Sequence, residues 1–298
     1  MLDDLKARWR HGGAVIRLIF INLAVFVGIW LCYAVLLAVT GGRESAFAAL
    51  NEWVVRQLAT PTELWELLVR PWTLIASMFT QVEPSHLFWN MVLLWFGGRM
   101  YQDLLGSKRL VGTYLLSGLA GMALFIIASN TYGPADQTAI GASAAVMGVL
   151  MAIATYQPHA LVNVILIGPV KLMYVAAVFI VLDFMGMGSN DGVAHEAHIG
   201  GAIYGFLASQ QLRRGNDWSL GFVNALEKAW SWVKPGRRSK LRVEKHYTRS
   251  ARADDLTFNQ RKKEQQARID AILDKISRSG YDSLSKEEKD VLFKAGKG

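Results

Sequence analysis

Ser143 is the residue whose surroundings point most directly to chemistry. It lies in the stretch GASAAVMG at 141–148, where small residues open an apolar run. A serine hydroxyl becomes a nucleophile when a base lies within about 3 Å of it, and His198 is the candidate base. His86 and Asn90 stand four residues apart, so they share a helical face and could donate hydrogen bonds to a developing oxyanion. These residue types predict serine-type hydrolysis if folding brings the three stretches together.

The elements that must position these residues are apolar runs long enough to cross a bilayer, which takes about 20 residues as a helix. The chain is 52% hydrophobic with a mean hydropathy of +0.23, too apolar for an ordinary soluble domain of this length. We therefore predict an all-α polytopic membrane protein with a bundle of six transmembrane helices. The predicted spans are residues 14–40, 85–105, 110–129, 142–156, 161–184 and 193–212. Gly168 and Pro169 are expected to kink or break the fifth span.

Topology brings the candidate residues to one level of this bundle. The second, fourth and sixth spans all start on the outer side, and His86, Ser143 and His198 lie at those three starts. Packing the fourth span on the sixth would set Ser143 beside His198, and the N-terminus of the fourth helix would add partial positive charge. Small residues that allow close helix packing are Gly141, Gly148, Gly201 and Gly205.

Simpler interpretations exist for each polar residue. A lone serine in a span is most often a helix-packing residue, and a lone histidine or asparagine at a helix end is often an interfacial group or an interhelical hydrogen-bond partner. We interpret His195 as one of these two. Asp183 and Glu196 are also predicted to be interfacial, and the alternative that a carboxylate orients a histidine stays open. The chain has one cysteine, Cys32, and no HExxH motif, so we expect neither a metal site nor a cofactor.

Basic residues are concentrated toward the C-terminus. Residues 213–298 carry a net charge of +9 and the remainder −1, so the charge does not line a fold-wide groove and no nucleic-acid partner is expected. We predict a membrane domain at 1–213, a basic juxtamembrane linker at 214–259 and a small helical cytosolic tail at 260–298. An anionic lipid or a protein is the expected partner of this basic region.

The distribution of charges and aromatic residues also predicts orientation. Basic residues favour a cytoplasmic location for both termini. The outer segment at 41–84 is rich in tryptophan and amphipathic, which favours the membrane interface. In the tail, Gly280 is expected to end one helix, and Ser285 and Glu288 to form a capping box at the start of the next.

Three motifs then resemble those of the rhomboid intramembrane serine proteases. The stretch HLFWN at 86–90 matches the family's HxxxN, GAS at 141–143 its GxS, and AHIGG at 197–201 its AHxGG. One such motif would be weak evidence, whereas three in the family's order are specific. The resemblance covers roughly residues 14–213.

The resemblance implies a mechanism and a setting. Ser143 would be the nucleophile and His198 the general base and acid of a dyad without an acidic third member. His86 and Asn90 would form the oxyanion hole with the Ser143 amide, in a cavity that admits water from the outer side. Substrates would be transmembrane segments of other proteins within the lipid bilayer. The resemblance and the tail also place the protein in a bacterial inner membrane.

The sequence departs from the family pattern at three points. Ala144 replaces the glycine that usually follows the serine, Gln81 stands where an outer histidine often precedes HxxxN, and Thr73 follows Trp72 in place of arginine.

An alternative function is a rhomboid-like protein that binds membrane segments without cleaving them. A transporter is a third hypothesis. It predicts charged groups near the bilayer midplane and internal repeats, and the sequence shows neither convincingly.

Overall fold

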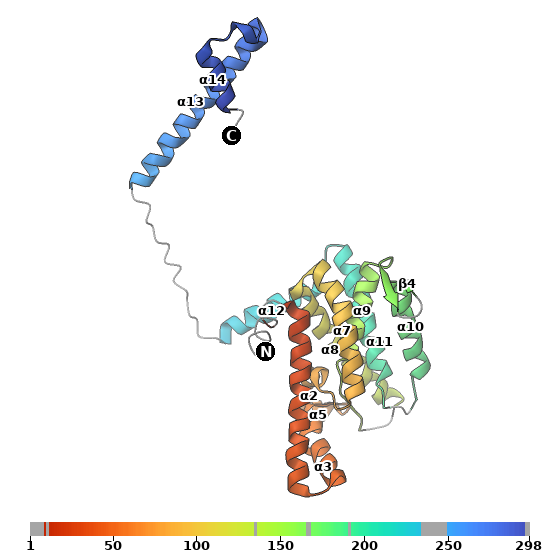
Figure 1. Ribbon diagram of the computed structural model, residues 1–298. Coiled ribbons are helices and arrows are strands. Elements are labelled where there is room, and N and C mark those ends of the chain that lie inside the picture. Colours follow the sequence, from red (N-terminus) through yellow and green to blue (C-terminus); the bar gives the residue numbers. More distant parts are fainter. Residues whose placement is uncertain are drawn as a thin grey trace. The chain divides into compact units, whose positions relative to one another are not determined.

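The computed structural model describes residue 9 and residues 12–133, 136–164, 168–189, 192–233 and 249–295. The chain divides into two compact units, which we call the bundle unit (Met1–Pro235) and the tail unit (Gly236–Gly298). Most of the described residues are helical, and two short strand pairs accompany the helices (Figure 1). The prediction of a mainly helical chain is therefore confirmed.

The bundle unit begins with one long helix and a series of short turns. Helix α2 (Gly13–Thr40) ends at Gly41, whose φ of 68° is favourable for glycine. Exposed tryptophans along the segment that follows have the character expected at a membrane interface. Its elements are α3 (Arg43–Leu50), the π-helical turn η1 (Asn51–Val55), α4 (Arg56–Leu58), β1 (Thr60–Pro61), α5 (Leu64–Val69), α6 (Thr73–Ala76) and the 3₁₀ turn η2 (Ser77–Phe79).

Five further helices complete the bundle, with α9 at its centre. This central helix is buried along almost its whole length and packs against α7, α8, α10 and α11. Helix α2 packs on α7 and α8, and α10 lies at the opposite edge of the bundle (Figure 1). The helices are α7 (Pro84–Leu105), α8 (Ser107–Thr131), α9 (Ser143–Tyr156), α10 (Leu172–Gly186) and α11 (His195–Arg213).

Two antiparallel strand pairs complete the unit. Strand β1 pairs with β2 (Thr138–Ala139) and so connects the segment at 41–84 to the stretch that enters α9. Strands β3 (Leu161–Val164) and β4 (Gly168–Lys171) form a hairpin ahead of α10. The prediction of one helical span over 161–184 is therefore wrong in its first half. Gly168 has a φ of 92° and Pro169 has no N–H to continue a helix, so this pair begins a strand where the sequence suggested a kink.

The number of membrane spans stays a prediction. Two helices are long and apolar enough to cross a membrane by length and composition within the described part of the chain, Gly13–Thr40 and Ser107–Thr131. Two shorter apolar helices, Ser143–Tyr156 and Leu172–Gly186, fall below that length.

A helix occupies the start of the region predicted to be a linker at 214–259. Helix α12 (Trp218–Val233) packs on α8, where the Ser219 and Thr113 hydroxyls lie 2.8 Å apart. A side chain at Gly112 would overlap the Ser219 backbone, so glycine permits this approach. The bundle unit consequently extends well past residue 213, where the sequence suggested that the membrane domain ends.

The tail unit contains α13 (Arg249–Ser279), the 3₁₀ turn η3 (Tyr281–Ser283) and α14 (Lys286–Ala295). Gly280 follows α13 with a φ of 78°. The Ser285 N–H donates to Glu288 Oε2 at 2.7 Å, and the Glu288 N–H donates to Ser285 Oγ at 3.2 Å. These reciprocal bonds are the predicted capping box.

Candidate active site

Side chains from four helices line one cavity of about 250 Å³ in the bundle unit. Helix α7 contributes His86 and Asn90, and α9 contributes Ser143 at its first position. The walls between them are largely apolar. The remaining polar lining residues are Asp183 from α10 and His195 and His198 from α11.

Ser143 opens α9 two positions after a constrained glycine. Gly141 has a φ of 129° and its N–H donates to the Ser77 carbonyl oxygen at 2.8 Å. A Cβ atom on Gly141 would lie 3.0 Å from His86 Cε1 and 3.5 Å from Ser143 Oγ. The backbone therefore brings the His86 ring and the Ser143 hydroxyl to the same point, and glycine leaves the space between them open.

The start of α9 also carries favourable electrostatics. The first N–H groups of a helix lack partners within the helix, and together they place partial positive charge at the N-terminus. The Ser143 amide is one of these groups. An oxyanion formed at Ser143 would thus face backbone donors as well as the polar side chains of α7.

Glycines set the distance between the serine helix and the histidine helix. A Cβ atom on Gly201 would overlap the Ala144 carbonyl oxygen, and one on Gly205 would overlap the Gly148 carbonyl oxygen. Gly148 in turn faces the Ser117 hydroxyl of α8 and the Gly201 carbonyl oxygen. Helices α9 and α11 therefore meet backbone to backbone, which holds His198 near the level of Ser143.

The unusual Ala144 is accommodated by another glycine. Ala144 is 1% exposed, and its methyl group lies against Gly121 of α8, where a Cβ atom would come within 2.6 Å of it. The absence of a side chain at Gly121 leaves room for the extra methyl group. Ala144 therefore fits beside the serine without separating α8 from α9.

Asp183 and His195 line the cavity. Their contact is an interhelical hydrogen bond, one of the two roles expected for His195. Asp183 is buried beside the histidines, where the sequence favoured an interfacial residue and left open a carboxylate that orients a histidine. Asp183 is only 6% exposed, and its Oδ1 lies 2.8 Å from His195 Nδ1 and 2.7 Å from His198 Nδ1. The three side chains also bring ligand atoms within 4.8 Å of one another, a spacing that could hold a metal ion. Each of the two ring nitrogens can donate a hydrogen bond to this carboxylate oxygen, so hydrogen bonding explains why the three side chains lie together.

A buried amide chain holds Asn90 from behind. The Asn90 Nδ2 group donates to Gln81 Oε1 at 2.7 Å, and Gln81 Nε2 donates to Asn22 Oδ1 at 3.0 Å. Asn22 Nδ2 lies 3.4 Å from the Tyr114 hydroxyl, which itself donates to the Met78 carbonyl oxygen at 3.1 Å. Gln81, which the sequence marks only as a departure from the family pattern, therefore orients a candidate oxyanion donor.

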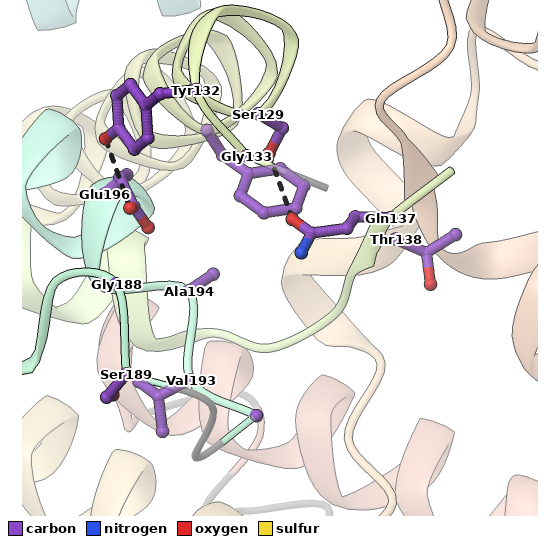
Figure 2. Close-up of a pocket in the computed structure, with 12 residues that line it drawn as sticks. Ser129, Tyr132, Gly133, Gln137, Thr138, Gly188, Ser189, Val193, Ala194 and Glu196 are labelled. Carbon is purple, nitrogen blue, oxygen red and sulfur yellow. Dashed lines mark hydrogen bonds between the residues drawn. The ribbon is translucent and has the colours of Figure 1, made fainter. Parts of the chain in front are cut away.

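A second, more polar cavity of about 550 Å³ adjoins the first, because Val193 lines both. Figure 2 shows the Tyr132 hydroxyl turned toward Glu196, to which it donates at 3.2 Å, and Ser129 turned toward Gln137. Partial burial and the nearby Glu196 carboxylate raise the pKa of the Tyr132 hydroxyl. Glu196, which the sequence predicts to be interfacial, lines this second cavity.

Comparisons with known proteins match each unit separately. A model of the rhomboid domain matches residues 68–215, and a family of unknown function (DUF6576) matches residues 254–294. RHOMBOID-like protein 12, mitochondrial, from Arabidopsis thaliana is 27% identical over 157 residues, which are 48% of this chain and 47% of that protein.

Other relatives show a similar degree of identity. The presenilin-associated rhomboid-like protein, mitochondrial, of Rattus norvegicus is 29% identical over 44% of this chain and 36% of its own length. RHOMBOID-like protein 4 of Arabidopsis thaliana is 29% identical over 54% of this chain and 36% of its own length. The chain thus spans less than half the length of these relatives. Two of the three names refer to mitochondria, so they give no support to the predicted bacterial inner membrane.

Proposed function

The chain belongs to the rhomboid family through its residues 68–215 and is accordingly an integral membrane protein, and from that premise we propose that it is an intramembrane serine endopeptidase. The observation that supports the proposal most strongly is the single cavity lined by Ser143, His198, His86 and Asn90. Its substrates would be transmembrane segments of other proteins, cut at or near their outer ends.

The reaction we propose uses these side chains in sequence. His198 removes the proton from the Ser143 hydroxyl as Oγ attacks the peptide carbonyl carbon. His86, Asn90 and the Ser143 N–H stabilise the oxyanion that forms. His198 then gives its proton to the leaving amine, and water that reaches the cavity from the outer side hydrolyses the acyl-enzyme. The glycines at the α9–α11 contact support the proposal because they keep nucleophile and base on closely packed backbones.

The same proposal includes the topology and the setting. Six spans would be formed by α2, α7, α8, α9, α10 and α11, with α9 and α10 shorter than the usual span. Both termini would face the cytoplasm of a bacterial inner membrane, on the basis of the basic residues and the resemblance. The basic region after α11 would contact anionic lipid or a protein partner.

A fluorophosphonate probe tests the proposal, because it forms a covalent bond only with an activated serine. In purified full-length protein we expect labelling of the wild type and loss of labelling in Ser143→Ala and His198→Ala, by about 10³-fold or more. Ser129→Ala is the matched control, since Ser129 lines the neighbouring cavity and should not affect labelling. Cleavage of a model transmembrane substrate should follow the same order.

Two outcomes would contradict the proposal. If Ser143→Ala kept wild-type cleavage, the nucleophile would be wrong. If the folded wild type neither reacted with the probe nor cleaved substrates, the chain would instead be a rhomboid-like protein that binds membrane segments without cutting them.

A further inference from the structure

Asp183 carries an inference that rests on the proposed function and goes beyond it. We propose that Asp183 is a positioning residue for His198, so that the site operates with a carboxylate–histidine–serine arrangement in place of a dyad. Helix α10 brings the carboxylate to α11, and Asp183 Oδ1 lies 2.7 Å from His198 Nδ1. The contact joins residues 15 positions apart, and both side chains line the cavity that contains Ser143.

The chemistry of the contact determines the tautomer of His198. An ionised carboxylate only accepts hydrogen bonds, so the proton of the neutral imidazole lies on Nδ1. The lone pair then lies on Nε2, which is the nitrogen required to accept the Ser143 proton. If Asp183 were absent, the ring could protonate Nε2 instead, and that tautomer cannot act as a base.

The charge of Asp183 serves the next step of the proposed reaction. Once His198 has taken the serine proton it is an imidazolium, and the carboxylate at 2.7 Å stabilises this cation in a largely apolar cavity. The carboxylate and the developing cation would interact strongly because Asp183 is 6% exposed and poorly screened by solvent. Stabilisation that appears only after proton transfer raises kcat and leaves substrate binding largely unchanged.

The surroundings of the carboxylate favour a functional role over a purely structural one in which Asp183 only joins α10 to α11. Asp183 Oδ2 is buried and, among the described residues, has no hydrogen-bond partner. A buried carboxylate oxygen without a partner lowers stability, so a residue retained only to join α10 and α11 would be poorly suited to that task. His195 donates to the same Oδ1 at 2.8 Å, and this second bond fixes the carboxylate in front of His198.

Asp183→Asn is the central test, made on full-length protein in detergent with a model transmembrane substrate. The amide keeps the shape but removes the charge and can donate to Nδ1, which favours the wrong tautomer. We expect kcat to fall about 10²–10⁴-fold while KM changes less than about threefold. Glu196→Gln is the matched control, because it removes a carboxylate two positions from His198 that faces Tyr132. His195→Gln should cost less than about tenfold, since the Asp183–His198 bond remains.

A spectroscopic measurement separates positioning from a structural role. In protein labelled with ¹⁵N at histidine, the imidazole nitrogen shifts report which nitrogen carries the proton, and His198→Ala identifies the His198 signals. We expect Nδ1–H in the wild type and a shift toward Nε2–H in Asp183→Asn. A fall in kcat with an unchanged tautomer and a lowered unfolding midpoint would overturn the inference. Asp183 would then have only a structural role, joining α10 to α11.

The remaining outcomes keep the two proposals distinct. If Asp183→Asn cleaved substrate at the wild-type rate while Ser143→Ala was inactive, the inference would be wrong and the proposed function would stand. A folded wild type that neither cleaves nor reacts with the probe would overturn the proposed function and, with it, a catalytic purpose for Asp183.

Discussion

Helices α9 and α11 of the bundle unit approach until their backbones touch, whereas a partly exposed ion pair links α13 and α14 of the tail unit. At the first contact, a Cβ atom on Gly148, Gly201 or Gly205 would overlap an atom of the facing helix. At the second, Lys275 Nζ of α13 bonds to Glu288 of α14 at 2.9 Å, and Lys289 Nζ of α14 lies 4.9 Å from the centre of the Tyr281 ring in the intervening turn η3.

The difference between these contacts shows where the distance between two helices must be closely fixed. Apolar helices in a bilayer gain nothing from burying apolar surface against one another, so close van der Waals packing of small residues must hold them. The same closeness controls the distance between Ser143 and His198. Exposed ion pairs contribute little to stability and tolerate exchange, which suits a unit that carries no part of the proposed catalytic site.

Gly205→Ala should break the first contact and produce the largest effect. The new methyl group would meet the Gly148 carbonyl oxygen, a backbone atom that cannot move without shifting α9. We expect a loss of about 1–3 kcal/mol in the free energy of unfolding, measured by denaturant titration in detergent. Probe labelling of Ser143 should also fall, because α11 carries His198.

Gly28→Ala is the control for this change. Within the described structure nothing lies within 4 Å of a Cβ atom at Gly28 of α2, so alanine should be neutral or stabilising by up to about 1 kcal/mol through its better helix propensity. Equal stability of Gly205→Ala and Gly28→Ala would show that the backbone contact between α9 and α11 is not tight.

Gln81→Leu should lower probe labelling less than Gly205→Ala does, and it should also lower stability. It removes the partner of Asn90 Nδ2 and of Asn22 Oδ1, both buried. Unpaired buried groups of this kind cost about 1–3 kcal/mol each. We expect a measurable loss of unfolding free energy and about a tenfold slower probe reaction, because Asn90 loses its orientation as an oxyanion donor.

Gln102→Leu provides the comparison for Gln81→Leu. Gln102 Oε1 accepts from the Val15 N–H at 3.0 Å, so it also joins α7 to α2, but at the end of α7 opposite to His86 and Asn90. This variant should lose stability without slowing the probe reaction. A similar slowing in both variants would mean that Gln81 acts only through stability.

Much of the bundle could be predicted from sequence because its signals are local. Five helices lie within three residues of the predicted spans, since apolar runs are bounded by glycine, proline or charged residues. Alternation of direction along the chain also predicts that Ser143, His198, His86 and Asn90 meet, and the four line one cavity. What these residues do chemically stays a prediction.

The missed features depend on contacts that no local signal carries. The run at 161–184 is apolar throughout, and an apolar run alone does not distinguish a helix from a strand. The β-branched Val162 and Val164 ahead of Gly168 are the signal that could have indicated the hairpin. Asp183 reaches His198 only because α10 packs on α11, and the role of Gln81 requires three elements to meet.

Glu288→Gln should produce the smallest effect, and it tests the polar contact of the tail unit. The Lys275 ammonium and the Ser285 N–H lower the pKa of the Glu288 carboxyl group. Because its pKa is lowered in the folded state, the ionised carboxylate stabilises that state at pH values above the ordinary pKa of glutamate. This contribution disappears as the pH falls through the lowered pKa.

At pH 7 we expect faster hydrogen–deuterium exchange over α14 in the Glu288→Gln variant than in the wild type, and no change in probe labelling of Ser143. At a pH below the lowered pKa the two proteins should exchange alike, because neither carries the charge. Equal exchange at both pH values would show that the negative charge of Glu288 does not stabilise α14 in solution, because glutamine can still form the capping box. Loss of probe labelling would contradict the independence of the candidate site from the tail unit.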